Sequence, residues 1–210
     1  MPRNSEMARP REFDEAAVLD AAVQCFWVRG YEATSIRDLA QKMGITGASL
    51  YNAFGDKRSL YRRALDHYLE QRLVERINRL EKRPPREAIG AFFSEIIERS
   101  LNDPQNKGCM LVNGALEASP LDPEFQRAIA DVFTQIEAFF RRCVVAGQHT
   151  GAISTSQPAD DLARLLLGVL LGIRVLARAR PERDLLEGLV RPALALLDYH
   201  TTAMGSIRHD

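Results

Sequence analysis

Residues 35–57 read SIRDLAQKMGITGASLYNAFGDK, and this stretch decides the fold of the first part of the chain. Its pattern predicts two short helices, Ser35–Lys42 and Thr46–Phe54, joined by a tight turn at Met43–Ile45 that contains a glycine. Two short helices joined in this way form a helix-turn-helix, in which the second helix is short enough to enter a DNA major groove end-on.

Capping side chains mark where both helices begin. Ser35 stands three residues before Asp38, which is the spacing of a capping box, and Thr46 brings an N-cap hydroxyl to the second helix. Helical hairpins with a glycine turn are common, however, and many bind nothing. The spacing alone therefore leaves both a DNA-binding unit and a purely structural hairpin open.

The first turn of the second helix has the small and polar side chains that a groove contact needs. Thr46 and Ser49 offer hydroxyls to phosphates or base edges. Gly47 and Ala48 permit close approach to the groove floor, where the Ala48 methyl suits a thymine methyl. These four residues are therefore candidate DNA contacts.

Three further residues are placed to reach phosphates. Tyr51 and Asn52 lie one turn along the second helix, although Tyr51 fits a half-buried core position equally well. Lys57 falls in the first turn of the next helix, where its charge and the free backbone N–H groups both favour an anion.

Three stretches here resemble the DNA-binding domain of TetR-family repressors. They are GYEATSIRDLA at Gly30–Ala40, MGIT at Met43–Thr46 and SLYNAFGDK at Ser49–Lys57. The rest of the chain resembles the family only in its length and number of helices. The resemblance implies a homodimer that binds a near-palindromic operator and represses transcription until a small effector binds the helical body.

The resemblance also implies DNA contacts for residues at the positions of Thr46, Ser49, Tyr51, Asn52 and Lys57, and a base or phosphate contact for Arg37. In the family, position 47 is often basic or polar, whereas this chain has Gly47 followed by Ala48. Such a helix has little bidentate base readout, so we expect specificity to depend on Arg37, Ser49 and DNA shape. The expected contacts are Ser35, Arg37, Thr46, Gly47, Ala48, Ser49, Tyr51, Asn52 and Lys57.

Composition limits the function classes. The 210 residues carry 28 Lys and Arg against 28 Asp and Glu, which excludes a histone-like coat for nucleic acid, although residues 29–63 hold an excess of four positive charges. Three cysteines with no disulfide or zinc spacing indicate a reducing cytoplasm. The polar start of the chain does not read as a signal peptide, and the longest apolar run, Leu165–Ile173, is too short to span a bilayer.

The chain as a whole reads as all-α, with an N-terminal three-helix helix-turn-helix domain followed by a six-helix ligand-binding and dimerisation body. We expect a flexible arm at 1–12, the DNA-binding domain at 13–60, the body at 61–204 and a tail at 205–210. The expected helices are Asp14–Arg29, Ser35–Lys42, Thr46–Phe54, Lys57–Glu81, Arg86–Leu101, Gly108–Ala118, Pro123–Gly147, Pro158–Ala179 and Glu182–Met204, the last with a kink at Pro192.

The helix expected at 158–179 is apolar nearly all round, so it must be covered on both sides. A second copy of the chain would cover it, whereas the alternative is a central helix in a monomer core. We expect the last two helices to pair with their copies as a four-helix bundle. The expected interface residues are Leu166, Gly168, Val169, Gly172, Ile173, Leu186, Leu189 and Leu197.

An effector pocket is expected among the helices of the body, although an aromatic stripe at this spacing is more often core. Asn113 and Glu117 are the sharpest candidates, because they are polar, four residues apart and flanked by apolar residues. The expected lining is Phe93, Ile96, Cys109, Met110, Asn113, Glu117 and Phe133.

Cys109 follows Gly108 at an expected helix start with Lys107 beside it, and both features lower a thiol pKa. The segment from Gly108 to Asn113 resembles a TetR subgroup that includes electrophile- and oxidant-sensing repressors. Cys109 is therefore either a reactive sensor or a small buried hydrophobe. Cys25 and Cys143 are expected in the core.

Two rival functions have less support. The four histidines are scattered, and no phosphate loop, serine elbow or paired carboxylates appear, so an enzyme, a metal site or a cofactor is not expected. A nonspecific architectural DNA-binding protein is disfavoured by the zero net charge, because its affinity would come from neutralising phosphates. A ligand-responsive regulator remains the preferred interpretation.

Overall fold

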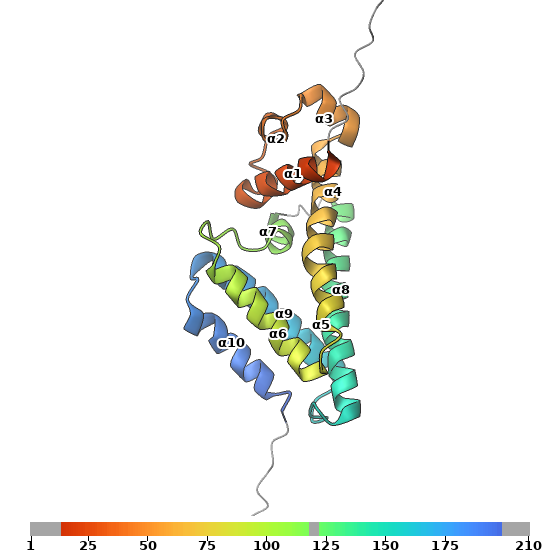
Figure 1. The fold of residues 1–210 in the computed structure, drawn as a ribbon, viewed down its shortest axis with the longest axis vertical. Helices are drawn as coiled ribbons and strands as arrows, with labels where there is room; N and C mark the ends of the chain where they lie inside the picture. The colour runs from red at the N-terminus through yellow and green to blue at the C-terminus, as the bar shows by residue number, and fades with distance from the viewer. Residues whose placement is uncertain (1–13, 118–121, 199–210) are drawn as a thin grey trace, which may run out of the picture. The chain divides into compact units, whose positions relative to one another are not determined.

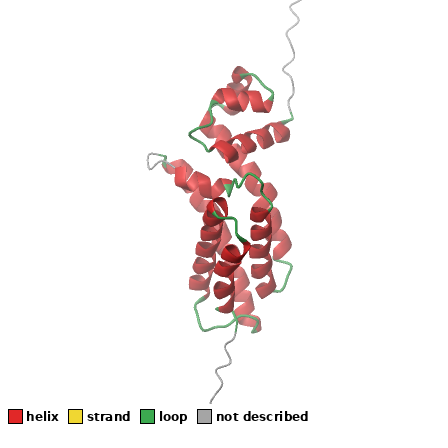
Figure 2. Ribbon diagram, turned by 90° about the vertical axis from the view of Figure 1, so that its left-hand side faces the viewer, coloured by secondary structure: helices red, strands yellow, loops and turns green. Residues whose placement is uncertain are grey.

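The computed structural model describes residues 14–117 and 122–198, and all regular elements in these ranges are helices, which confirms the all-α prediction (Figures 1 and 2). When α4, η1 and α5 are counted as the single helix that the sequence predicts, the described part of the chain holds the nine expected helices. The elements are α1 (Glu15–Arg29), α2 (Ile36–Met43), α3 (Gly47–Phe54), α4 (Lys57–Leu69), η1 (Glu70–Val74), α5 (Glu75–Leu80), α6 (Pro85–Leu101), α7 (Met110–Glu117), α8 (Pro123–Thr150), α9 (Ala159–Ala179) and α10 (Arg183–Ala195).

The helices divide into two compact units, one ending at Tyr68 and the other beginning at Leu69. This division falls later than residue 60, because α4 contributes its aromatic side chains to the core of the first unit. The ring of Tyr61 lies edge-on to Phe26 at 4.9 Å between centroids, and that of Tyr68 lies edge-on to Trp27 at 5.1 Å. Aromatic pairs of this geometry add to the apolar burial that holds α1 and α4 together.

The helix predicted at 57–81 contains a π-helical turn at its middle. Asp56 caps its first turn, since the Asp56 carboxylate accepts a hydrogen bond from the Ser59 N–H at 2.7 Å. Residues Glu70–Val74 then wind as a π-helix, and regular α-helix resumes and ends at Leu80. The next helix begins with Pro85 at its first position, where the missing N–H is not needed.

Four phenylalanines form the centre of the second unit. Phe92 and Phe93 of α6 and Phe139 and Phe140 of α8 are each at most 1% exposed. The Phe93 and Phe140 rings stack with 5.6 Å between centroids, while Phe92 lies edge-on to Phe140 at 5.1 Å. Burying each ring stabilises the fold by about 1.5–3 kcal/mol relative to leaving it exposed, so this cluster fixes α6 against α8.

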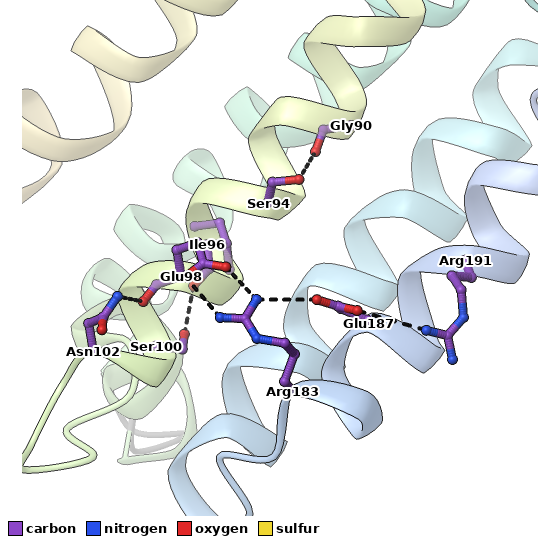
Figure 3. Close-up of polar contacts among 9 residues, drawn as sticks. All are labelled: Gly90, Ser94, Ile96, Glu98, Ser100, Asn102, Arg183, Glu187 and Arg191. Carbon is purple, nitrogen blue, oxygen red and sulfur yellow. Dashed lines mark hydrogen bonds and ion pairs between the residues drawn. The ribbon is translucent and has the colours of Figure 1, made fainter.

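Helices α6 and α10 run side by side and are joined by ion pairs on the surface (Figure 1). Figure 3 shows Arg183 of α10 donating to both oxygens of Glu98 on α6 and to Glu187 one turn along α10. Exposed pairs of this kind each contribute about 0–1 kcal/mol to the free energy of unfolding. Their main effect is therefore on the register of the two helices.

The predicted end of the long helix α8 near Gly147 is wrong. The helix continues to Thr150 and ends at Gly151, whose φ of +75° provides the left-handed cap. Gly147 lies inside the helix instead, and a Cβ added there would lie 2.5 Å from Cδ1 of the buried Ile153. This glycine is needed for close packing rather than for ending the helix.

Two other predicted boundaries differ. The helix expected from Gly108 begins at Met110, because Gly108 has a φ of +72° that a helix does not use, and Ala118 lies outside the described residues. The helix expected to reach Met204 ends at Ala195. Beyond that point the Leu197 carbonyl accepts from the Ser154 N–H at 2.8 Å rather than from a helical partner. The expected arm and tail lie outside the described residues.

Among the described residues, no helix is long and apolar enough to cross a membrane. No group of three or more His, Cys, Asp or Glu side chains in these ranges is placed to hold a metal ion.

We predict that Gly147→Ala destabilises the protein by roughly 1–3 kcal/mol, because the new methyl group would overlap Ile153. Gly90→Ala in the middle of α6 is the matched control, since the nearest atom to its added Cβ is Arg86 Nη1 at 3.7 Å. That control should gain roughly 0.5–1 kcal/mol from helix propensity. Urea unfolding of both variants measures the difference, and equal midpoints would contradict the packing argument.

Candidate nucleic-acid interface

A complete capping box begins α2. The Ser35 hydroxyl donates to Asp38 Oδ2 at 2.6 Å and accepts from the Asp38 N–H at 3.1 Å, while the Ser35 N–H donates to the same carboxylate at 3.1 Å. Arg29 at the end of α1 pairs with the other carboxylate oxygen at 2.5 Å. The Ser35 hydroxyl, the Ser35 N–H and Arg29, in that order, lower the pKa of Asp38 to about 2.

The turn between α2 and α3 is fixed by Gly44. Its φ of +68° is left-handed, and its N–H points back to the carbonyls of Ala40 and Gln41. The Ile45 N–H also returns to the Ala40 carbonyl, at 3.1 Å. A side chain at Gly44 would meet no atom within 4 Å, so the backbone conformation alone requires glycine here.

Thr46 and Ser49 organise the start of α3. Thr46 Oγ1 accepts from the Ser49 N–H at 3.1 Å and lies 2.9 Å from Ser49 Oγ. The cap satisfies one of the orphan N–H groups of the first turn, and the others remain directed out of the helix end. Gly47 would place an added Cβ only 4.0 Å from Ile36 Cγ2, so this end of α3 lies close to α2.

The two faces of α3 differ sharply in burial. Leu50 is fully buried and Phe54 is 5% exposed, so this face packs into the first unit. Tyr51 is 52% exposed, which places it outside the core rather than half-buried within it. The outward positions of the helix-turn-helix are exposed at Ser35, Arg37, Thr46, Ala48, Tyr51 and Asn52 and partly exposed at Gly47, Ser49 and Lys57.

Lys57 is oriented by contacts that the sequence does not reveal. Its ammonium donates to the Glu32 carbonyl at 3.3 Å and lies over the Tyr31 ring at 4.4 Å from the centroid. Tyr31 and Glu32 follow α1, so these contacts bring two distant segments together. An ammonium has three donors, and one hydrogen bond leaves capacity for a phosphate.

Most residues predicted to line an effector pocket lie in the core of the second unit. Asn113 is 8% exposed, and its side-chain amide donates to the Lys107 carbonyl at 2.9 Å. This bond fixes the loop before α7 and accounts for the buried amide. Phe93, Ile96, Cys109 and Met110 are buried, whereas Glu117 and Phe133 are partly exposed.

The predicted interface residues of α9 and α10 separate into two groups. Leu166, Ile173, Leu186 and Leu197 are fully buried within one chain and belong to its own core. Gly168, Val169, Gly172 and Leu189 are exposed or partly exposed. Leu165 and Val175, which are not among the predicted interface residues, are 40% and 48% exposed and lie on the same outward face of α9 as Gly168 and Gly172.

A helix-turn-helix with a capped outward helix, followed by a helical body, is an arrangement typical of DNA-binding transcriptional regulators. The family described as "Bacterial regulatory proteins, tetR family" matches residues 18–64, and the family described as "Tetracyclin repressor-like, C-terminal domain" matches residues 85–192. The chain therefore belongs to the TetR family, whose members are transcriptional regulators rather than enzymes.

Relatives extend this likeness over nearly the whole chain. YezE, an uncharacterised HTH-type transcriptional regulator of Bacillus subtilis, is 34% identical over 195 residues, which cover 91% of this chain and 100% of that protein. The repressor ComR of Escherichia coli is 28% identical over 190 residues, or 90% of each protein. The regulator CifR, solved as a cysteine mutant with a 26-bp double-stranded operator, is 34% identical with a TM-score of 0.82 and covers 90% of this chain and 100% of its own.

We predict that Asp38→Asn lowers stability most above pH 4. The folded-state pKa of about 2 lies below the ordinary 3.8, so the carboxylate stabilises the fold above the ordinary value and loses that effect as the pH falls through 2. The gap between the urea midpoints of the two proteins should be constant from pH 5 to 7 and shrink between pH 4 and 2. The matched control is Asp66→Asn on the exposed side of α4, and a gap that widens in acid would contradict the prediction.

Proposed function

We propose that this regulator is a homodimer that binds a near-palindromic operator through α3 and is released when a small effector binds the body. The observation that carries the proposal is the outward face of α3, where Thr46, Ala48, Tyr51 and Asn52 are exposed while the opposite face is buried. Because it would bind an operator, the regulator would act in the cytoplasm of a bacterial cell.

The proposed contacts fall into two kinds. Tyr51, Asn52 and Lys57 would hold phosphates and fix the register of the protein on the duplex. Gly47 and Ala48 bring the helix start close to the base edges but supply no bidentate donors. Arg37 and Ser49 would then carry most of the direct readout, with sequence-dependent DNA shape contributing the rest.

The proposed dimer uses the outward face of α9 together with α10. Leu165, Gly168, Val169, Gly172 and Val175 repeat at intervals of three and four residues, which places them on one face. An added Cβ at Gly168 or Gly172 would meet nothing within 4 Å, so the backbone is open to close approach. Two-fold symmetry would then set the recognition helices about 34–36 Å apart, one turn of duplex.

The effector would act by shifting the population of two states of the dimer. A ligand favours a state only by as much as its affinity differs between the states, and a coupling of about 1–3 kcal/mol changes affinity 5–150-fold. Release by modification of Cys109 stays a prediction of the resemblance. The thiol is 8% exposed, so reagents would need an opening of the body to reach it.

A gel shift with duplexes selected from random sequence tests operator binding and separates it from nonspecific architectural binding. A sequence-specific regulator retains its selected duplex at higher salt while random duplex is lost, because nonspecific affinity comes from phosphate neutralisation. Equal affinity for selected and random duplexes at two salt concentrations would overturn the proposal.

We predict that Lys57→Gln reduces the slope of log affinity against log salt concentration by about one, because one phosphate contact is lost. The measurement is fluorescence anisotropy of a selected duplex at four salt concentrations. Lys82→Gln is the control, since Lys82 is exposed in the second unit. An unchanged slope for the Lys57 variant would remove this residue from the interface.

We predict that Val169→Glu converts the dimer to monomers, because the new carboxylate would be buried without a partner at the α9 interface. Sedimentation velocity measures the mass, and operator affinity should fall with it. Val145→Glu on the exposed side of α8, where Val145 is 42% exposed, is the control and should remain dimeric. A dimeric Val169 variant would show that α9 does not form the interface.

A further inference from the structure

Two arginines of the second unit are buried, although charged side chains are seldom buried unless they are fully paired. Arg76 of α5 and Arg174 of α9 are each 7% exposed. The helical spacing of the sequence is sufficient to predict the burial of Arg174. This residue lies four residues after Leu170 and three before Ala177, so the helical repeat places it on the buried face of α9.

Arg76 is only partly neutralised. Its Nε donates to Glu95 Oε2 at 3.2 Å, and its guanidinium lies over the Phe92 ring at 5.5 Å from the centroid. The same carboxylate also receives two hydrogen bonds from Arg79, each at 2.8 Å. One glutamate therefore serves two guanidinium groups. Burial first, and then the charges of Arg99 and Arg174, lower the pKa of Arg76.

Arg174 has a weaker partner still. Its Nη1 donates to Ser100 Oγ at 3.2 Å, and Figure 3 shows that the Ser100 hydroxyl is itself bound to the Ile96 carbonyl, at 2.8 Å. In the described ranges no carboxylate lies within ion-pair distance of Arg174. A guanidinium has five N–H donors, and this one uses a single donor on a neutral hydroxyl.

This arrangement lacks negative charge. A buried charge is ordinarily paired, so an unpaired one favours the approach of a counter-charge. The charges of Arg99 and Arg174 both lower the pKa of Arg76, and the Glu95 carboxylate opposes them. The planar guanidinium suits carboxylate and phosphate groups in a two-pronged geometry. Phe92 on α6 and Leu170 on α9 are buried apolar residues of the same unit.

We propose that Arg174, with Arg76 and the Ser100 hydroxyl, forms the anion-recognising part of the effector site, so that the effector is a small organic anion with a carboxylate or phosphate group. The proposal rests on the effector-responsive function proposed above and names the chemical class of the effector. Arg174 supplies the free donors, Ser100 holds its guanidinium in place, and Arg76 adds a second positive charge.

The test uses the full-length protein and three probes, namely benzoate, octanoate and phenyl phosphate. Isothermal titration calorimetry at constant ionic strength, balanced with sodium chloride, measures binding of each probe. We expect saturable binding of at least one probe, weakened at least tenfold by Arg174→Met. Arg164→Met is the matched control on the same helix, because Arg164 is exposed and already pairs with Asp161 at 3.1 Å and with Glu137 at 3.4 Å.

The pattern among the probes identifies the group that is recognised. Binding of benzoate or octanoate assigns a carboxylate, whereas binding of phenyl phosphate alone assigns a phosphate. Inorganic phosphate at the same concentration shows whether the apolar part of the probe contributes. Failure of all three organic probes to bind, or equal affinity for wild type and Arg174→Met, would overturn the proposal.

Two further measurements keep the test decisive. Arg174→Met should remain folded, because it removes a buried charge that has no carboxylate partner, and Arg174→Lys replaces it in the test if circular dichroism shows otherwise. With Arg174→Lys we expect weaker binding, since the charge remains but the two-pronged geometry is lost. Operator binding without probe is measured in parallel. Operator binding without anion binding defeats this inference alone, whereas loss of selective duplex binding by wild type defeats the proposed function.

Discussion

The burial of Leu50 and Phe54 is the constraint on which the helix-turn-helix depends. With one face of α3 held in the core, the helical repeat leaves Thr46, Ala48, Tyr51 and Asn52 on the surface. The cap at Thr46 and the left-handed Gly44 fix where the helix begins, so the exposed residues are presented in a defined order. In the proposed complex, Gly47 and Ala48 would then allow the backbone of α3 to approach a groove closely.

Local sequence signals were sufficient to predict the helix-turn-helix. They failed at positions whose role is decided by packing against distant residues. The capping box of Ser35 and the turn at Gly44 act over three or four residues, so their spacing in the sequence predicts them correctly. Gly147 is also a glycine, but it does not end a helix. Only the position of Ile153 shows that this glycine provides room for packing and that Gly151 ends the helix.

The residues of α9 illustrate the same limit. An apolar sequence all round predicts that the helix is covered on both sides, but it does not say which side faces its own chain. The structure assigns Leu166 and Ile173 to the core, and Leu165 and Val175 to the outward face. The helical repeat is enough to predict that Arg174 is buried. Its partner Ser100 lies 74 residues earlier in the chain, so no sequence pattern predicts the hydrogen bond between them.

Arg76 lies only eight residues along the chain from the end of the first compact unit at Tyr68. Arg76 is the second residue of α5, directly after the π-helical turn Glu70–Val74, and this turn begins two residues after the first compact unit ends. A π-helical turn within an α-helix is frequently found at functional sites, since its backbone is less regular than the α-helix on either side. An anion that neutralises Arg76 would change the electrostatics at this junction of the chain. Coupling of the proposed anion site to α4 would run through this π-helical turn and would require two states of the turn that differ in their affinity for the anion.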